Sequence, residues 1–345
     1  MQASTGGSVQ YGTVIMRTWL LRRVMADFGA VAHTQRLLGL EKDKPPRLPL
    51  LHVSLRIAAA LGDEMFYMMA LPLLFWVWPG GDAARRLVYV WMLVYYLGHT
   101  AKDLLQLPRP PSPPVLQLER HYATEYGLPS THAMVALALP FSALHMLQDP
   151  QLRLSLFPVA LLWTGLISLS RLYLGVHSFT DVYAGLLLGV AITCFHVLAG
   201  VSIDAFVLAR PDFPVVASAS LVLLLYLYPA PKKWTNAYGD TTAILAAGIG
   251  ILVGNWTLVR EGKHVLEWSL STDVAIKLLC RACLGYLIIF VTRALVKFVC
   301  LTSLRVSSHE LKQYSKEIPV KILVYGFVGF NLSYTAIKIF EFLGI

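Results

Sequence analysis

The chain has 345 residues, of which 56% are hydrophobic and 14% are charged. Soluble domains carry about 25% charged residues, so this composition excludes an ordinary soluble protein and predicts one that is embedded in lipid. The formal net charge is +9, but the basic residues are scattered along loops and the ends of apolar segments, which favours contact with anionic lipid headgroups or a phosphate over nucleic acid.

Residues 1–51 form a basic N-terminal arm. Its arginines alternate with apolar residues at helical spacing: Arg17, Arg22, Arg23 and Arg36. This pattern is compatible with an interfacial helix lying on anionic lipid and equally with a solvated helix packed on the rest of the protein. The arm lacks an uninterrupted apolar core before a small-residue cleavage site, so no secretory signal peptide is expected.

From residue 52 onward the chain is a series of apolar windows. A helix needs roughly 20 apolar residues to cross a bilayer. Judged against that length, the windows lie at 52–78, 86–104, 132–148, 154–170, 180–200, 214–229, 241–258, 274–300 and 319–343. The sequence therefore predicts an all-α, polytopic membrane helical bundle of about 8–10 transmembrane helices. We expect residues 52–345 to form a single transmembrane domain.

Ionisable groups within or beside membrane spans are costly and usually functional, and three clusters of them stand out. The first is KDLLQLPRPPSPP, in which Lys102 lies at the end of an apolar window and Arg109 just beyond it. The window stops there because prolines cannot continue a helix. Taken alone, a lysine and an arginine at a helix end are also compatible with anchors that extend toward the membrane surface.

The second cluster lies in the segment EYGLPSTHAM. Gly127 and Pro129 mark a turn. Ser130 or Thr131 is suited to cap the helix that starts there. Free backbone N–H groups at such a start bind anions, and His132 falls in the first turn. Taken alone, the segment fits a capped helix with a hydrogen-bonded interfacial histidine equally well.

The third cluster is SRLYLGVHSFTDVYAG. Ser170 and Arg171 end one window, and Gly175 permits a tight reversal. His177 then opens the next helix, with Asp181 four positions later on the same face. The carboxylate can accept a hydrogen bond from one ring nitrogen and leave the other unprotonated, as a nucleophile or base requires. A structural ion pair would show the same spacing.

Topology joins the three clusters. If the windows at 132–148 and 154–170 are antiparallel, the loop before the first and the loop after the second open on one membrane face. The residues expected to converge there are Lys102, Arg109, Ser130, His132, Arg171, His177 and Asp181. No acidic cluster remains for Mg²⁺, so the cations would neutralise a phosphate. Charge stabilisation and positioning are most of what phosphoryl transfer needs.

The motifs K-x6-R-P from Lys102, P-S-T-H from Pro129 and S-R-x5-H-x3-D from Ser170 resemble the signature motifs of the type 2 phosphatidic acid phosphatase superfamily. They cover residues 102–185. The usual second motif is P-S-G-H, and Thr131 replaces the glycine here. With that departure, the chain is most similar to the sphingosine-1-phosphate phosphatases and their long-chain-base phosphatase relatives in the endoplasmic reticulum.

The resemblance implies a role for each motif residue. His177 would attack phosphorus to form a phosphohistidine, with Asp181 holding its ring. His132 would protonate the leaving alkoxide and then activate water. The groups expected to hold the phosphoryl oxygens are Lys102, Arg109, Arg171, Ser130 and the amide of Thr131, with a supporting contact from Ser170. The resemblance implies no metal and no other cofactor.

These expectations describe a phosphoric monoester hydrolase of sphingolipid metabolism that converts sphingosine 1-phosphate or dihydrosphingosine 1-phosphate to the sphingoid base and phosphate. The alternatives are a glucose-6-phosphatase-like enzyme, which Asp181 disfavours, a broader lipid phosphate phosphatase, a lipid phosphotransferase, and a non-catalytic lipid-binding or transport relative.

The resemblance also implies a multi-pass protein of the endoplasmic reticulum membrane with a lumenal catalytic site. If two spans precede Lys102, the basic arm shares that side, against the positive-inside tendency. Residues 201–345 carry no chemical motif, and we expect them to complete the bundle or to form a homo-oligomer interface.

Overall fold

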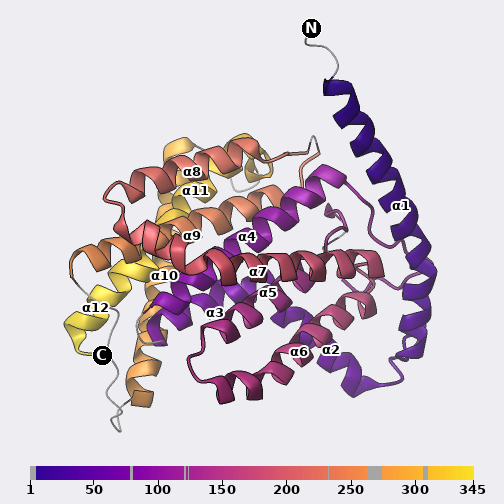
Figure 1. Ribbon diagram of the computed structural model, residues 1–345, viewed down its shortest axis with the longest axis horizontal. Coiled ribbons are helices and arrows are strands. Elements are labelled where there is room, and N and C mark those ends of the chain that lie inside the picture. Colours follow the sequence, from indigo (N-terminus) through magenta and orange to yellow (C-terminus); the bar gives the residue numbers. More distant parts are fainter. Residues whose placement is uncertain are drawn as a thin grey trace.

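The computed structural model describes residues 5–77, 81–119, 122, 124–231, 233–262, 274–305 and 310–345, which form helices and loops without a β-strand (Figure 1). The α-helices in chain order are α1 (Thr5–Leu37), α2 (Pro49–Leu61), α3 (Glu64–Val77), α4 (Asp82–Leu105), α5 (Thr131–Met146), α6 (Pro150–Tyr173), α7 (Phe179–Ala209), α8 (Phe213–Leu227), α9 (Asn236–Arg260), α10 (Val274–Leu304), α11 (Tyr314–Phe330) and α12 (Ala336–Leu343). A 3₁₀ turn (Glu310–Lys312) precedes α11, and a π-helical turn (Asn331–Thr335) joins α11 to α12. The all-α prediction is confirmed.

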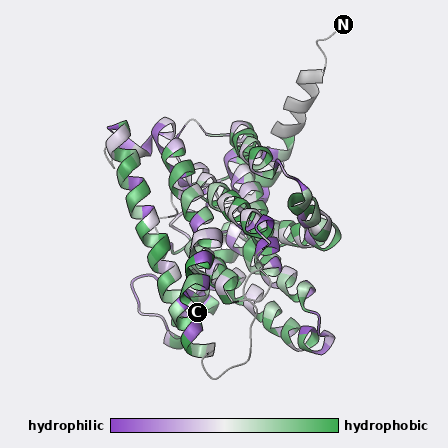
Figure 2. Cartoon of the chain, turned by 90° about the vertical axis from the view of Figure 1, so that its left-hand side faces the viewer, coloured by the Kyte–Doolittle hydropathy of each residue, from purple (hydrophilic) through white to green (hydrophobic). Residues whose placement is uncertain are grey.

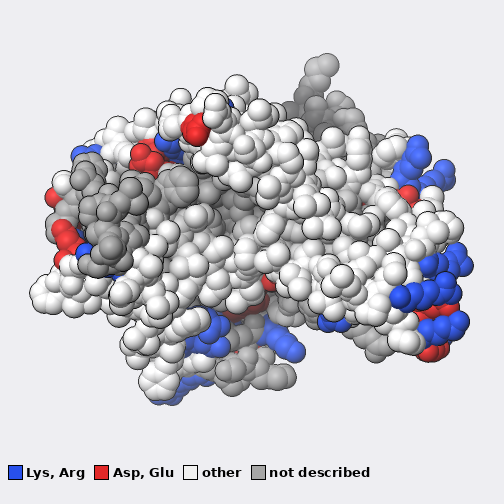
Figure 3. All heavy atoms as spheres, turned by 90° about the horizontal axis from the view of Figure 1, so that it is seen from below, with Lys and Arg blue, Asp and Glu red and all other residues white. Residues whose placement is uncertain are grey.

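Several helices have the length and composition of membrane spans. Among the described residues five qualify, or six if α2 and α3 form one broken span, where the sequence predicts about 8–10. The five are α6, α7, α9, α10 and the segment from α11 through α12. The apolar helices α5 and α8 are shorter than the length this count requires. Hydrophobic residues predominate along the long helices (Figure 2). On the face in Figure 3, most of the visible surface is uncharged. Large apolar side chains that are exposed, such as Leu198 and Phe298, are the expected lipid contacts.

The window at 52–78 is not one straight helix. It divides into α2 and α3, which are bent by 63°. The break falls at Gly62 and Asp63, because Asp63 Oδ1 accepts a hydrogen bond from the backbone N–H of Met65 at 2.9 Å and so caps α3. Without the bend, Asp63 would lie within a span. The bend instead places its side chain beside the loop that precedes α5, where it accepts the Tyr122 hydroxyl.

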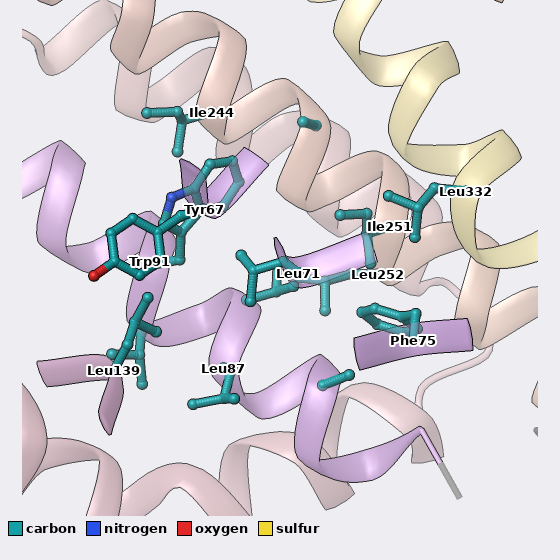
Figure 4. Packing of buried hydrophobic residues seen from close by; sticks show 14 of the residues in the cluster. Tyr67, Leu71, Phe75, Leu87, Trp91, Leu139, Ile244, Ile251, Leu252 and Leu332 are labelled. Carbon is teal, nitrogen blue, oxygen red and sulfur yellow. The ribbon is translucent and has the colours of Figure 1, made fainter. Parts of the chain in front are cut away.

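The centre of the bundle is apolar and joins both halves of the chain (Figure 4). Tyr67 and Phe75 of α3 and Trp91 of α4 belong to the same buried cluster as Leu139 of α5 and Ile251 of α9. The cluster extends through the π-helical turn into α12. Residues beyond 201 are therefore part of the core that supports α4 and α5, the two helices that carry the first two motifs.

A buried polar cluster holds α4, α7 and α9 together. Arg85 donates to Asp204 at 2.6 and 2.7 Å and to the side-chain oxygen of Asn255 at 2.6 Å. Lys102 follows Arg85 by 17 positions on α4, which places the cluster roughly 25 Å from Lys102 along the helix axis. The cluster therefore fixes the end of the bundle opposite the motif loops.

Helix α1 packs against those motif loops. Gln35 donates to the carbonyl oxygens of Leu116 at 2.8 Å and Tyr173 at 2.9 Å. Asp27 accepts hydrogen bonds from the backbone N–H and the hydroxyl of Thr180, both at 2.7 Å. The basic arm and the motif loops thus share one face of the bundle.

Candidate active site

The first motif places two cations around one carboxylate. Lys102 lies in the last turn of α4, which ends at Leu105 before the proline-rich loop. Lys102 Nζ and Arg109 Nη2 lie 3.1 and 3.2 Å from the same Oε2 of Glu125. Both cations are almost fully buried, so Glu125 is the anion that balances them in the absence of a substrate.

The charge of Glu125 follows from this pairing. Burial by itself raises the pKa of the Glu125 carboxyl, but the positive charges of Lys102 and Arg109 outweigh it and bring the pKa to about 2. Glu125 is therefore ionised at any working pH. A carboxylate held by a lysine and an arginine occupies the kind of site that a phosphate group would take.

The second motif starts α5 as a capped helix. Ser130 is the N-cap, and its hydroxyl accepts a hydrogen bond from the backbone N–H of Ala133 at 3.4 Å. The sequence is compatible with Ser130 or Thr131 as the cap, and in the structure the cap is Ser130. Thr131 begins the helix and accepts a hydrogen bond from Lys102 Nζ at 3.4 Å, which links the first two motifs directly.

His132 lies beside two groups outside the motifs. Its Nε2 is 3.4 Å from the hydroxyl of Tyr122 and 4.0 Å from Asp63 Oδ2. The Tyr122 hydroxyl donates to the same Asp63 oxygen at 2.9 Å. The signal for Asp63 was present in the sequence, since it is an ionisable residue inside an apolar window. Tyr122 has no comparable signal.

The third motif differs from its predicted geometry in one respect. His177 does not open a helix; α7 begins at Phe179 with Ser178 as its N-cap. The prediction that His177 and Asp181 share a helix face is therefore wrong, yet the two still meet. Asp181 Oδ2 accepts from the backbone N–H of Ser178 at 2.8 Å in a capping box. This reach back to the helix start brings the same oxygen to 3.4 Å from His177 Nδ1.

The other ring nitrogen of His177 faces Arg109. Arg109 Nη1 lies 3.1 Å from His177 Nε2. Because a guanidinium only donates, Nε2 is the acceptor and the ring proton is on Nδ1, toward Asp181. Burial lowers the pKa of His177 well below its ordinary value, and the charges of Arg109 and Arg171 lower it further. His177 is therefore a neutral imidazole whose Nε2 lone pair faces Arg109.

The two remaining third-motif residues have different surroundings. The Ser170 hydroxyl donates to the carbonyl of Ile167 at 2.6 Å, within its own helix. Arg171 is buried, and its Nε and Nη2 have no hydrogen-bond partner among the described residues. Its guanidinium lies 4.9 Å from the centre of the Tyr122 ring, and that of Arg109 lies 5.3 Å from the same centre.

A small cavity joins the motifs. Its volume is about 40 Å³, and it unites five of the predicted residues. The lining is formed by Lys102, Arg109, Thr131, His132 and His177, together with Asp63, Glu64, Tyr95, His99, Tyr122 and Glu125. The structure does not bring Ser130, Ser170 or Arg171 into this lining, and Asp181 stands behind His177.

The cavity corrects one premise of the sequence interpretation. The sequence predicts no acidic cluster beside the cations, whereas Asp63, Glu64 and Glu125 all line the cavity. They come from two segments of the chain that spacing alone does not connect. In the described part of the chain, no group of three or more His, Cys, Asp or Glu side chains is arranged to hold a metal ion.

Comparisons with known proteins agree with the motifs. The model of the PAP2 superfamily matches residues 83–202. Sphingosine-1-phosphate phosphatase 2 of Mus musculus is 33% identical over 94% of this chain and 99% of its own length. Sphingosine-1-phosphate phosphatase 1 of Mus musculus is 34% identical over 88% of this chain and 74% of its own length. A dihydrosphingosine 1-phosphate phosphatase of Schizosaccharomyces pombe is 30% identical over 79% of this chain and 70% of its own length. No solved structure matches the chain.

Proposed function

The chain belongs to the PAP2 superfamily, and we propose that it is a membrane phosphatase that releases phosphate from sphingoid-base phosphates with His177 as its nucleophile. Relatives that match most of the chain are named as phosphatases of sphingosine 1-phosphate and of its dihydro form, which supports the substrate class. The observation that carries the mechanism is the neutral His177, whose Nε2 faces a cavity lined by Lys102 and Arg109.

The first step forms a phosphohistidine. Lys102 and Arg109 hold the phosphoryl oxygens, helped by the backbone amide of Thr131 at the start of α5. The Nε2 lone pair of His177 attacks phosphorus, the N–P bond forms, and the P–O bond to the lipid breaks. His132 in its protonated form gives its proton to the departing alkoxide, so the sphingoid base leaves as an alcohol.

The second step reverses the proton transfer. His132, now neutral, takes a proton from a water molecule while the water oxygen attacks phosphorus. The N–P bond breaks, inorganic phosphate leaves, and His177 returns to its neutral form. Asp181 stabilises the imidazolium character that the ring of His177 carries while the phosphoryl group is attached.

Arg171 and Glu125 adjust when the substrate binds. Among the described residues, Nε and Nη2 of Arg171 have no hydrogen-bond partner, so these donors can turn to the phosphoryl group once the Tyr122 ring moves. The cavity of about 40 Å³ holds about one water molecule and is too small for a phosphate group. Glu125 must therefore move away, and the phosphate then takes its place beside Lys102 and Arg109. The cations already neutralise charge, so the mechanism needs no metal ion.

Phosphate release from a substrate panel tests this function. The purified protein in detergent is given sphingosine 1-phosphate, dihydrosphingosine 1-phosphate, phosphatidic acid and glucose 6-phosphate, each with and without EDTA. We expect rapid release from the first two, much slower release from the sugar phosphate, and no effect of EDTA. Equal hydrolysis of phosphatidic acid would indicate a broader lipid phosphatase, and preferential hydrolysis of glucose 6-phosphate would overturn the proposal.

A further inference from the structure

A second and larger cavity adjoins the phosphate site. It is an open groove of about 810 Å³ along α2 and the start of α3. Its walls are mainly apolar, with Val53, Ile57, Ala60, Met65 and Phe66 among the lining residues. Large apolar side chains at its edge, including Ile57 and Met65, are exposed. The groove has the chemistry that a single hydrocarbon chain needs.

The groove and the phosphate cavity meet at two residues, Asp63 and Tyr122, which line both. Asp63 is the single carboxylate that the two linings share within the described part of the chain. It lies at the bend between α2 and α3, and its side chain is 31% exposed, whereas that of Glu125 is 11% exposed. A molecule with its phosphate in the cavity and its chain in the groove therefore passes the Asp63 carboxylate.

Two of the other carboxylates near this junction, Glu125 and Glu119, already have cationic partners, and Glu64 lines the phosphate cavity but not the groove. Glu125 is held by Lys102 and Arg109, and Glu119 lies 3.5 Å from Arg171. Asp63 Oδ2 instead accepts the Tyr122 hydroxyl and lies 4.0 Å from His132. The ion pairs of the described residues include no lysine or arginine at Asp63. His132 is the one group able to carry a positive charge among the ion-pair partners of Asp63 in the described part of the chain. The carboxylate can therefore also meet a cation that arrives with the substrate.

A sphingoid-base phosphate brings such a cation. It carries phosphate on its first carbon, an ammonium group on the second, a hydroxyl on the third, and then one long chain. The ammonium therefore lies between the phosphate and the chain. We propose that Asp63 determines specificity for amine-bearing lipid phosphates by binding this ammonium through Oδ2. This inference rests on the proposed function and adds a substrate-selecting contact to it. Lipid phosphates without the amine lack this contact.

The test compares two substrates in one variant. Asp63→Asn removes the charge but keeps an oxygen that can accept the Met65 N–H, so the cap of α3 is preserved. The kcat/KM values for sphingosine 1-phosphate and for hexadecyl phosphate, which has no amine, are measured in the same detergent. We expect the ratio between them to fall about 10- to 100-fold, the loss of one charge-assisted hydrogen bond, mainly through a higher KM for sphingosine 1-phosphate.

A purely structural or His132-positioning role of Asp63 predicts a different pattern. In that case both substrates lose kcat equally, and the ratio stays constant. Asp149→Asn is the matched control, because Asp149 Oδ1 caps α6 by accepting the Gln151 N–H at 2.8 Å, in the same way that Asp63 caps α3. We expect no change in the ratio for this control.

A change in the substrate provides a second measurement that needs no variant. N-acetylation of sphingosine 1-phosphate removes the ammonium charge, so the wild-type protein should discriminate against it, and Asp63→Asn should abolish most of that discrimination. An unchanged preference in the variant would overturn the inference while leaving the phosphatase function intact. Failure of the wild-type protein to release phosphate from either lipid would instead overturn the proposed function.

Discussion

At the residue scale, the two histidines have separate environments, and we therefore expect them to have separate roles. His177 touches Asp181 and Arg109, whereas His132 lies beside Tyr122 and Asp63. One environment holds a neutral ring with its lone pair facing cations, as a nucleophile requires. The other offers a hydroxyl and a carboxylate, which suits a group that both gives and takes a proton.

Replacement of each histidine by asparagine separates these roles. His177→Asn removes the nucleophile, so we expect neither turnover nor a covalent intermediate. His132→Asn keeps the nucleophile, and we expect kcat to fall about 10²–10⁴-fold, the typical contribution of general acid–base catalysis. Alkaline trapping of ³²P-labelled protein measures the intermediate. Substantial activity in His177→Asn would show that the mechanism is wrong.

The low pKa of His177 predicts the pH dependence of the reaction. A nucleophile must be unprotonated, and burial together with Arg109 and Arg171 lowers the pKa of His177 well below its ordinary value. Protonation of His177 therefore does not limit kcat/KM until the pH falls well below about 6.5, the ordinary pKa of histidine. Arg109→Met removes the nearest cation, so the pKa rises and the acid limb of the kcat/KM profile should move to higher pH. An acid limb that moves to lower pH would contradict this assignment.

Glu125 competes with phosphate for the same two cations. Glu125→Gln removes the charge that Lys102 and Arg109 now neutralise. We therefore expect inorganic phosphate to inhibit the variant at lower concentration than it inhibits the wild-type protein, by about tenfold for one competing charged hydrogen bond. Product-inhibition constants measure this. Weaker inhibition would mean that Glu125 chiefly positions the two cations.

At the element scale, each motif residue is placed by the start or end of a helix. The end of α4 carries Lys102, Ser130 caps α5, and the capping box of α7 brings Asp181 to His177. The helices in turn depend on contacts at their opposite ends, where the Arg85 cluster joins α4, α7 and α9.

Loss of one partner in that cluster should destabilise the bundle. Asp204→Ala leaves the buried guanidinium of Arg85 without its bidentate partner, and we expect the free energy of unfolding to fall by about 3–5 kcal/mol. Thermal unfolding in detergent measures the change. The control is Asp212→Ala, which breaks an exposed pair with Arg210 of the same 2.6 Å length and should change stability little. Equal effects of the two variants would contradict a stabilising role for the buried cluster.

At the scale of the whole molecule, the arrangement of α1 bears on membrane sidedness. Because α1 contacts the motif segments through Gln35 and Asp27, the basic arm and the proposed catalytic residues lie on one face of the bundle. We propose that this face is the lumen of the endoplasmic reticulum, as the family resemblance implies, although the positive-inside tendency favours the cytosol for so basic an arm.

Protease protection in sealed microsomes tests this orientation. Tags are placed at residue 1 and in the loop at 111–118, and external protease is added with and without detergent. We expect both tags to be protected until detergent opens the membrane, as the proposed lumenal orientation requires. Digestion of the loop tag in sealed vesicles would place catalysis in the cytosol, and opposite results for the two tags would contradict the shared face.

The sequence by itself determined the class of the protein and indicated the groups that we propose to be reactive. Apolar windows predict helices because each helix satisfies its own backbone hydrogen bonds in lipid. The proline stop after Lys102 and the Ser130 cap are local signals, set by residues within one turn of each other. They correctly placed the C-terminal end of α4 and the N-terminal start of α5. The motif spacing also linked His177 to Asp181, although through the wrong local geometry.

Only the tertiary structure decided what surrounds those groups. Asp63, Tyr122 and Glu125 reach the cavity because the α2–α3 bend and the loop before α5 pack over the end of α4. No periodicity relates positions 63 and 132, since side chains this far apart meet only when several helices pack together. The junction of the phosphate cavity with the apolar groove has the same origin. Local spacing therefore indicated the groups that we propose to be catalytic, while packing between distant segments decided which side chains and cavities surround them.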